Sequence, residues 1–194
     1  NGIKIKRTIS YDEITDSFKN NVQLENLNDQ FKGITLSLSE KSIGEIAQSI
    51  FSPTFESQEV ITVHGSKDER VKSSALSEKY DGNFSNVRLV GISSHYFTSS
   101  LVDKSDVAPD VTIKAGKDVS EVSALLVYRP VQNSKATLEL SWITYSGGKS
   151  LATLEKIDND FKQVLDLGFF ASIGIVLLKV MQWCYSMIPN WGLA

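Results

Sequence analysis

Cysteine and histidine are scarce in this sequence of 194 residues, which has one cysteine, Cys184, and two histidines, His64 and His95. A single cysteine excludes an intramolecular disulfide and any zinc site built from several thiolates. Two imidazoles without a cluster of further ligands also argue against a catalytic metal centre. We therefore expect neither a metal nor another cofactor, whereas cysteine usage alone leaves the cellular compartment open.

An excess of basic residues is also missing, since 20 Lys and Arg residues face 23 Asp and Glu residues and the formal net charge is −3. A protein that binds a phosphate backbone needs a basic surface, so we expect no nucleic-acid partner. The opening residues, NGIKIKRTIS, lack the basic segment and apolar run of a signal peptide, and we expect any signal or anchor to lie outside this sequence. The length suits one domain with an appendage.

Complete catalytic motifs are absent as well. The segment Ser146–Ser150 ends in Gly-Lys-Ser, as a phosphate-binding loop does, but Ile143 stands where that motif needs its first glycine. No G-x-S-x-G sequence occurs, and His95 beside Tyr96 is more typical of a packed strand residue than of a base. We therefore expect no catalytic residues and no enzyme.

The first part of the chain consists of short segments in which apolar and polar residues alternate. Ile34, Leu36 and Leu38, for example, are separated by Thr35, Ser37 and Ser39, which is typical of a half-buried strand. Turn-rich pieces such as Tyr80–Asn83 separate these segments. The pattern predicts a mainly β fold, an antiparallel β-sandwich over residues 1–148. The expected strands lie around Ile3–Ile5, Phe18–Leu24 and Ile34–Leu38, and at Glu59–His64, Asn86–Ile92, His95–Val102, Val111–Ala115, Ser120–Tyr128 and Ala136–Tyr145.

Helical periodicity is rare before residue 149. Ser42–Phe51 has Ile43, Ile46, Ala47 and Ile50 on one side and is expected to form a helix. Lys67–Glu78 is compatible either with a second helix or with a mobile loop.

From residue 149 to residue 165 the apolar period changes to three and four residues. Leu151, Leu154, Ile157 and Phe161 form one stripe, which predicts a helix over Ser150–Gln163 that packs on the sandwich. Ser150 is expected to be its N-cap, and Asp158 and Lys162 are expected to form an i,i+4 pair.

Residues 166–189 form a second, more apolar segment. Phe169–Ile188 is long enough to span a bilayer, but Ser172, Lys179, Gln182 and Ser186 share one side, which favours an amphipathic helix in the membrane interface. A spanning helix and a helix buried within the protein remain alternatives. Residues 190–194 are expected to begin a truncated transmembrane segment. The expected membrane-interface residues are Phe169, Phe170, Leu177, Lys179, Met181, Trp183, Tyr185 and Trp191.

Two stretches carry a resemblance to a known family. Val90–Leu101, with the pair Tyr96-Phe97 followed by small residues, is similar to a strand motif in the periplasmic domain of the YidC membrane protein insertases. Asp166–Phe170, continued by Lys179, Trp183, Ser186 and Asn190–Gly192, is similar to the interfacial helix of that family and the start of its next transmembrane helix. The opening segment Asn1–Thr8, followed by Val22–Asn26, resembles a strand pair of the same domain. Tyr145–Lys149 departs from the family pattern because it lacks a proline.

The resemblance implies a sandwich of the galactose-mutarotase supersandwich type, reduced in size, with C-terminal α-helices. It further implies a periplasmic domain of a bacterial inner-membrane protein that supports insertion of membrane proteins. The implied partners are the Sec translocon including SecDF, nascent membrane proteins, and the bilayer surface through the C-terminal helix.

Two other function classes stay open. A sugar-binding or mutarotase-like sandwich enzyme would need a positioned acid and base, and neither histidine has an obvious acidic partner in the sequence. A lipid-anchored scaffold with a membrane-surface helix is the third possibility.

Overall fold

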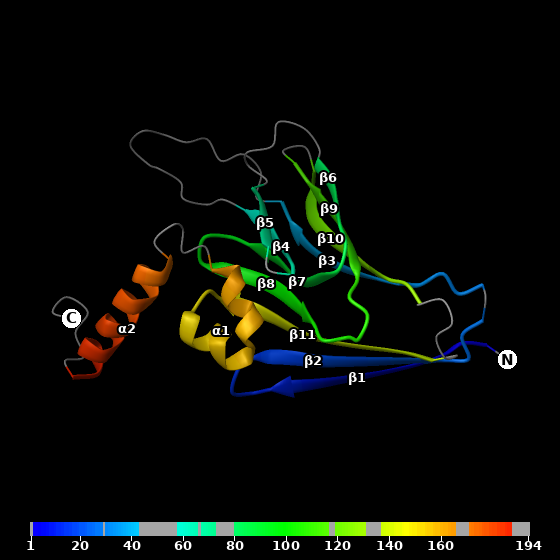
Figure 1. Ribbon diagram of the computed structural model, residues 1–194, viewed down its shortest axis with the longest axis horizontal. Coiled ribbons are helices and arrows are strands. Elements are labelled where there is room, and N and C mark those ends of the chain that lie inside the picture. The colour runs from blue at the N-terminus through cyan, green and yellow to red at the C-terminus, as the bar shows by residue number, and fades with distance from the viewer. Residues whose placement is uncertain are drawn as a thin grey trace. The chain divides into compact units, whose positions relative to one another are not determined.

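The computed structural model describes residues 2–28, 30–42, 58–65, 67–72, 80–116, 119–130, 137–165 and 171–187. Its contacts divide the chain into two compact units, Asn1–Val164 and Leu165–Ala194, called unit 1 and unit 2 below. Unit 1 contains all the described strands (Figure 1). These are β1 (Lys4–Asp12), β2 (Ser17–Glu25), β3 (Ile34–Lys41), β4 (Glu59–His64), β5 (Lys67–Lys72), β6 (Tyr80–Phe84), β7 (Val87–Ser93), β8 (Phe97–Asp103), β9 (Asp110–Ala115), β10 (Glu121–Tyr128) and β11 (Thr137–Gly148).

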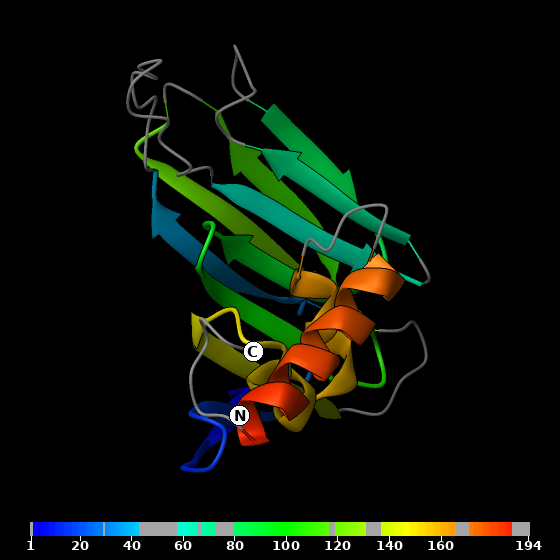
Figure 2. The same cartoon turned by 90° about the vertical axis from the view of Figure 1, so that its left-hand side faces the viewer.

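The described strands form two antiparallel sheets. The larger sheet has seven strands in the order β1-β2-β11-β8-β7-β4-β5, and the smaller has four in the order β3-β10-β9-β6. Figure 2 shows the twist of these strands, which is the usual consequence of L-residue geometry. The expected mainly β sandwich with C-terminal helices is confirmed.

Alternation of apolar side chains explains the core between the two sheets. Every second residue of β10 is buried, from Val122 through Tyr128, and Trp142 of β11 is buried with them. The opposite surfaces of most strands carry polar residues, as expected for an antiparallel sheet with one solvated face. The buried residues of this core include Leu24, Val60, Val90, Ile92, Ile113, Leu126, Tyr128, Leu140 and Trp142.

The larger sheet is also covered on part of its outer face. Five consecutive residues of β4, from Glu59 to Val63, are buried, so this strand is enclosed on both sides. Helix α1 (Leu151–Ile157) packs on the 3-10 helix η2 (Asn159–Val164), and η2 contacts β7 and β8. A second apolar layer therefore lies between η2 and the sheet, with Ile61, Val63, Leu89 and Val102 on the strand side.

Three expectations about secondary structure are wrong. Lys67–Lys72 is neither helix nor loop but strand β5, and the turn-rich Tyr80–Asn83 lies within strand β6. The single helix expected at Ser150–Gln163 is divided into α1 and η2 by Asp158, whose backbone is extended. Of the helix expected at Ser42–Phe51, residues 43–51 lie outside the described residues, as do residues 73–78.

Unit 2 contains helix α2 (Ala171–Met187). Of the helices that the structure describes, none has the combination of length and apolar character needed to cross a bilayer.

Candidate functional site

The segment that leads from the sandwich toward unit 2 begins where β11 ends. Ser150 is the N-cap of α1, although its side chain makes no capping hydrogen bond. Leu151, Leu154 and Phe161 are buried, whereas Ile157 is only partly buried. The ring of Phe161 meets that of Tyr145 on β11 edge to face, with centroids 6.3 Å apart. Three of the four residues expected to pack on the sandwich are thus enclosed.

Small side chains cover part of one face of β7 and β8, the two strands that η2 contacts. Ser93 donates to Thr98 Oγ1 at 2.8 Å, and the hydroxyls of Thr98 and Ser100 are 2.5 Å apart; all three residues are buried. A Cβ at Gly91 would lie 2.7 Å from Ser100 Oγ, so any larger residue there would force the serine hydroxyl to move. The motif Val90–Leu101 therefore supplies a surface without bulky side chains on this face of the sheet.

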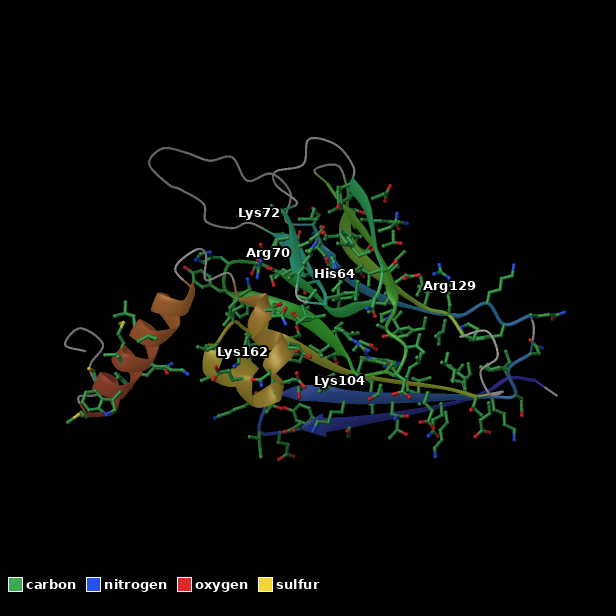
Figure 3. The ribbon with its side chains drawn as sticks, in the orientation of Figure 1. His64, Arg70, Lys72, Lys104, Arg129 and Lys162 are labelled. Carbon is green, nitrogen blue, oxygen red and sulfur yellow. The ribbon has the colours of Figure 1, made fainter. Side chains whose placement is uncertain are left out.

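Arg70 links the edge strand β5 to η2. Figure 3 labels the Arg70 side chain. Its guanidinium donates to the backbone oxygen of Gln163 at 2.6 Å and to the carboxylate of Glu59 at 3.2 Å. The ammonium of Lys149 lies 3.6 Å from the same carboxylate. Glu59 is 6% exposed, so this ion-pair cluster of Glu59, Arg70 and Lys149 fastens the end of β11 and the end of η2 to β4 and β5.

Lys104 holds the other end of η2. Its ammonium lies 2.8 Å from the carboxylate of Asp158 and 3.0 Å from that of Asp160. Partial burial disfavours the charged amine, but the hydrogen bonds and charges of the two aspartates outweigh it and raise the pKa of Lys104. Lys162 pairs with Glu155 at 3.3 Å, so the expected pair of Asp158 with Lys162 is wrong.

A buried polar network joins the two sheets beneath this segment. The Asp103 carboxylate of β8 accepts hydrogen bonds from Tyr128, Ser105 and Arg88 at 2.9, 2.7 and 3.0 Å. Burial raises the pKa of Asp103, although these donors oppose the rise. Burial and the neighbouring Asp103 charge also raise the pKa of Tyr128 far above its usual value, so its hydroxyl stays a neutral donor.

The predicted membrane-interface residues fall in unit 2. Leu177, Lys179 and Trp183 are exposed, and Met181 and Tyr185 are partly buried. Phe169, Phe170 and Trp191 lie outside the described residues. Val176, Val180 and Met187 are also exposed on α2, and they are not among the residues predicted from the sequence.

The histidines occupy positions that differ from expectation. His95 lies exposed in the turn between β7 and β8, so its interpretation as a packed strand residue is wrong. His64 does have an acidic neighbour, since its Nε2 is 3.4 Å from a Glu69 carboxylate oxygen, and its ring stacks on Phe84 with centroids 6.0 Å apart. Within the described parts of the chain, no group of three or more His, Cys, Asp or Glu side chains is placed to hold a metal ion.

Glu59, Arg70 and Lys104 were not singled out from the sequence. Arg70 lies in the charged run Lys67–Lys72, which has no apolar period, and its partner Gln163 is distant along the chain. The pairing of β5 with β4 brings Arg70 close to η2, and no sequence pattern within Lys67–Lys72 predicts that pairing.

Comparison with known proteins finds similar sequences over most of the chain. The sequence model of the YidC periplasmic domain matches residues 1–180. A protein named membrane protein insertase YidC from Pseudoalteromonas atlantica (strain T6c / ATCC BAA-1087) is 23% identical over 201 residues, which cover 98% of this chain and 35% of that protein.

Two further relatives have the same name. The protein from Pseudoalteromonas translucida (strain TAC 125) is 27% identical over 137 residues, covering 68% of this chain and 25% of the relative. The protein from Shewanella woodyi (strain ATCC 51908 / MS32) is 24% identical over 160 residues, which cover 79% of this chain and 28% of the relative. The matches therefore span between a quarter and about a third of the length of these curated relatives.

Proposed function

Because the chain belongs to the YidC periplasmic domain family, we propose that it acts as the accessory domain of a membrane protein insertase and sets the position of the helix that follows the sandwich. It is a periplasmic domain of an inner-membrane protein. Support for insertion and folding of nascent membrane proteins is the role proposed for it, without catalytic turnover of a small molecule.

The double attachment of η2 to the sandwich carries this proposal. Lys104 binds one end of η2 through Asp158 and Asp160, and Arg70 binds the other end through the Gln163 carbonyl. Between these contacts, Phe161 is fully enclosed. A segment fixed at both ends defines where the chain leaves unit 1 at Val164, which is what a domain that positions a membrane-surface helix requires.

Helix α2 is proposed to lie in the membrane interface. Val176, Trp183 and Met187 are exposed on it, and Lys179 can extend its ammonium toward lipid headgroups. Apolar side chains of this size are stabilised at a lipid surface by removal from water.

The Sec translocon, including SecDF, is the proposed docking partner, along with nascent membrane proteins. Sheet edges are the physical candidates for such docking because their free N–H and C=O groups can accept another strand. In the described sheets, the edge strands are β1 and β5 of the larger sheet and β3 and β6 of the smaller.

Membrane insertion of a reporter by the full-length protein tests this proposal. Deletion of most of Asn1–Val131 should be tolerated better than deletion of Phe169–Ile188, because the second deletion removes the proposed interfacial helix. A finer comparison uses Lys104→Gln, which releases η2, and Lys19→Gln, which removes the exposed pair of Lys19 with Asp12 elsewhere on the domain. Only Lys104→Gln should reduce insertion.

Two results would contradict the proposal. One is equal tolerance of both deletions. The other is hydrolysis or isomerisation of a sugar by the purified chain at a rate that His95→Ala abolishes, which would favour the sugar-converting sandwich enzyme.

A further inference from the structure

Two aromatic side chains are exposed to solvent at the tip of the β7–β8 hairpin. Tyr96 is 69% exposed and Phe97 is 64% exposed. The tip is ordered by its own hydrogen bonds, since the Ser94 amide donates to the Phe97 carbonyl at 2.9 Å and the Phe97 amide donates to Ser94 Oγ at 3.2 Å. The rings of His95 and Tyr96 meet edge to face with centroids 4.5 Å apart. These aromatic side chains are therefore held outward on a structured turn.

This tip lies at the end of the larger sheet where β11 passes into α1, called the junction end below. Phe97 is paired with Gly148, the last residue of β11, and the Lys149 amide donates to the Tyr96 carbonyl at 2.8 Å. The β1–β2 turn lies at the same end, because Ser17, which follows that turn, is paired with Tyr145 of β11. In Figure 1 both hairpin turns and the start of α1 lie on the same side of unit 1.

The β1–β2 turn adds further apolar surface to the junction end. Ile14 is 85% exposed, and the rings of Tyr11 and Phe18 lie 5.1 Å apart beside it, both exposed. At the opposite end of the sheet, the β4–β5 turn between His64 and Lys67 has no exposed large apolar side chain in the described part of the chain. Among the described residues of unit 1, the exposed large apolar side chains therefore lie at the junction end or in a row along β1.

We propose that the junction end is a second lipid-contact surface, in which Tyr96 and Phe97 enter the headgroup region of the inner membrane and Ile14 touches it. The domain belongs to an inner-membrane protein, and this same end continues into the segment that leads to α2. Tyr is favoured at a membrane interface because its ring can leave water while its hydroxyl stays hydrated, and the apolar ring of Phe is stabilised when it leaves water. This inference goes beyond the positioning of α2, because it concerns the sandwich itself.

Charge distinguishes the two turns of this surface. The β7–β8 tip has no carboxylate between Ser93 and Phe97, whereas the β1–β2 turn includes Asp12, Glu13 and Asp16. Asp12 is paired with Lys19, and Asp16 accepts a hydrogen bond from the Tyr11 hydroxyl. Carboxylates remain in water, so the deeper contact belongs to the β7–β8 tip.

An environment-sensitive fluorophore on a single cysteine tests the position of the tip. In the full chain with Cys184→Ser, the nitrobenzoxadiazole label is placed at Tyr96→Cys, at Lys67→Cys on the opposite turn, or at Met187→Cys on α2. Each protein is mixed with vesicles of phosphatidylethanolamine and phosphatidylglycerol, with and without spin-labelled lipid. The label at position 96 should shift its emission to shorter wavelength and be quenched by spin-labelled lipid, and the label at position 67 should do neither.

Binding strength provides the matched comparison. The double variant Tyr96→Ser/Phe97→Ser should partition to the vesicles on the order of tenfold more weakly, since two rings no longer leave water. Ile5→Ser removes an apolar side chain that is also 64% exposed, but on β1 toward the other end of the sheet, and should leave partitioning unchanged. Circular dichroism of each variant checks that the sandwich is folded.

The outcomes separate this inference from the proposed function. A shift at position 187 without a shift at position 96 overturns the lipid contact of the tip and leaves the role of α2 standing. Another outcome is that Tyr96→Ser/Phe97→Ser abolishes reporter insertion while the label at position 96 shows no emission shift. That outcome would mean that the tip binds a protein partner, and it also overturns the inference. Absence of shifts at both positions contradicts both proposals.

Discussion

The hydroxyl of Tyr128 donates a hydrogen bond of 2.9 Å to the buried carboxylate of Asp103, and this bond joins the smaller sheet to the larger. Asp103 is 2% exposed and Tyr128 is fully buried. The same carboxylate accepts from Ser105, whose hydroxyl also donates to the Ser141 carbonyl on β11. One network thus ties β8, β10 and β11 together at the end of the sandwich where Lys104 holds η2.

Tyr128→Phe should lower the free energy of unfolding by about 1–3 kcal/mol, because the buried carboxylate loses one of its donors. Tyr11→Phe is the matched control, since Tyr11 also donates to an aspartate, Asp16, but is exposed. That control should change stability by less than about 0.5 kcal/mol. Urea unfolding monitored by tryptophan fluorescence measures both. Equal losses of unfolding free energy in the two variants would mean that the hydrogen bond between the sheets stabilises the protein no more than an exposed one does.

Asp103 should also make stability depend on pH in a defined direction. Burial raises the pKa of Asp103 in the folded protein above its ordinary value of 3.8, so the folded state binds a proton more readily than the unfolded chain. Stability from this group is therefore fully present below the unfolded pKa and is lost as the pH rises through the folded pKa. The free energy of unfolding of the wild type, relative to Asp103→Asn, should be higher in acid than at neutral pH.

Asp12 offers a control of opposite sign. Slight desolvation would raise the pKa of Asp12, but the Ile14 amide and Lys19 outweigh it and lower the pKa. The stability of the wild type relative to Asp12→Asn should therefore fall as the pH drops through the folded pKa. Urea titrations of the three proteins at several pH values test both trends, and parallel curves for the two variants would contradict the assignment to Asp103.

Phe161→Ala should cost about 3–5 kcal/mol, because the fully buried ring leaves a cavity beside Tyr145 when it is removed. Ile157→Ala is the comparison within the same segment, and its partly buried side chain should cost clearly less. The measurement is equilibrium unfolding in urea. A loss near 0.5 kcal/mol for Phe161→Ala would show that η2 is loosely tethered to the sheet.

The sequence predicts the central strands well because their pattern and their burial coincide. Glu59–His64 is β4 with the expected bounds, and Val111–Ala115 and Ser120–Tyr128 differ from β9 and β10 by one residue each. In these strands β-branched and apolar side chains fill a core position at every second residue or at every residue, so local preference and tertiary packing favour the same structure.

Two of the four edge strands, β5 and β6, could not be predicted for the opposite reason. Lys67–Lys72 is rich in charged residues that suit a helix, yet β4 pairs with it and Arg70 reaches Glu59. In β6, Gly82 resembles a turn residue, but a Cβ there would collide with the ring of Tyr80, so glycine makes room for a neighbouring side chain. Tertiary pairing overrides local preference in both strands.

The candidate site was predictable only in its apolar part. The period of Leu151, Leu154 and Phe161 identifies the face that is buried, because helical spacing is a local property. Asp158, which lies at the break between α1 and η2, forms an ion pair with Lys104, more than fifty residues earlier in the chain, and sequence spacing carries no information about such a contact.

Arg70→Met should destabilise the domain by about 2–4 kcal/mol, because Glu59 stays buried with Lys149 as its remaining cation. Adding Glu59→Gln to Arg70→Met should restore part of the loss, since the uncompensated charge is removed. Lys72→Met, which removes an exposed cation from the same strand, should be nearly neutral.

A double-mutant cycle on Glu59 and Arg70, measured by urea unfolding, gives the coupling directly. Hydrogen exchange of the amides of 161–164 adds a local readout, because Arg70 also binds the Gln163 carbonyl. Protection there should fall in Arg70→Met and stay unchanged in Lys72→Met. Additive losses with unchanged protection would contradict the role of the ion-pair cluster.

The exposed face of α2 should make the chain self-associate or require detergent. Val176, Val180, Trp183 and Met187 are 62, 50, 64 and 67% exposed and recur at spacings of four, three and four residues, which places them along one side of the helix. Truncation after Leu167 should therefore give a monomer without detergent. The triple variant Val176→Ser/Val180→Ser/Trp183→Ser should be largely monomeric under the same conditions, whereas Gln182→Ser should associate like the wild type. Sedimentation velocity and flotation with liposomes measure these states. An intact chain that is monomeric without detergent and does not float would mean that this face is covered within the chain, because apolar area of this extent does not stay in water without a partner.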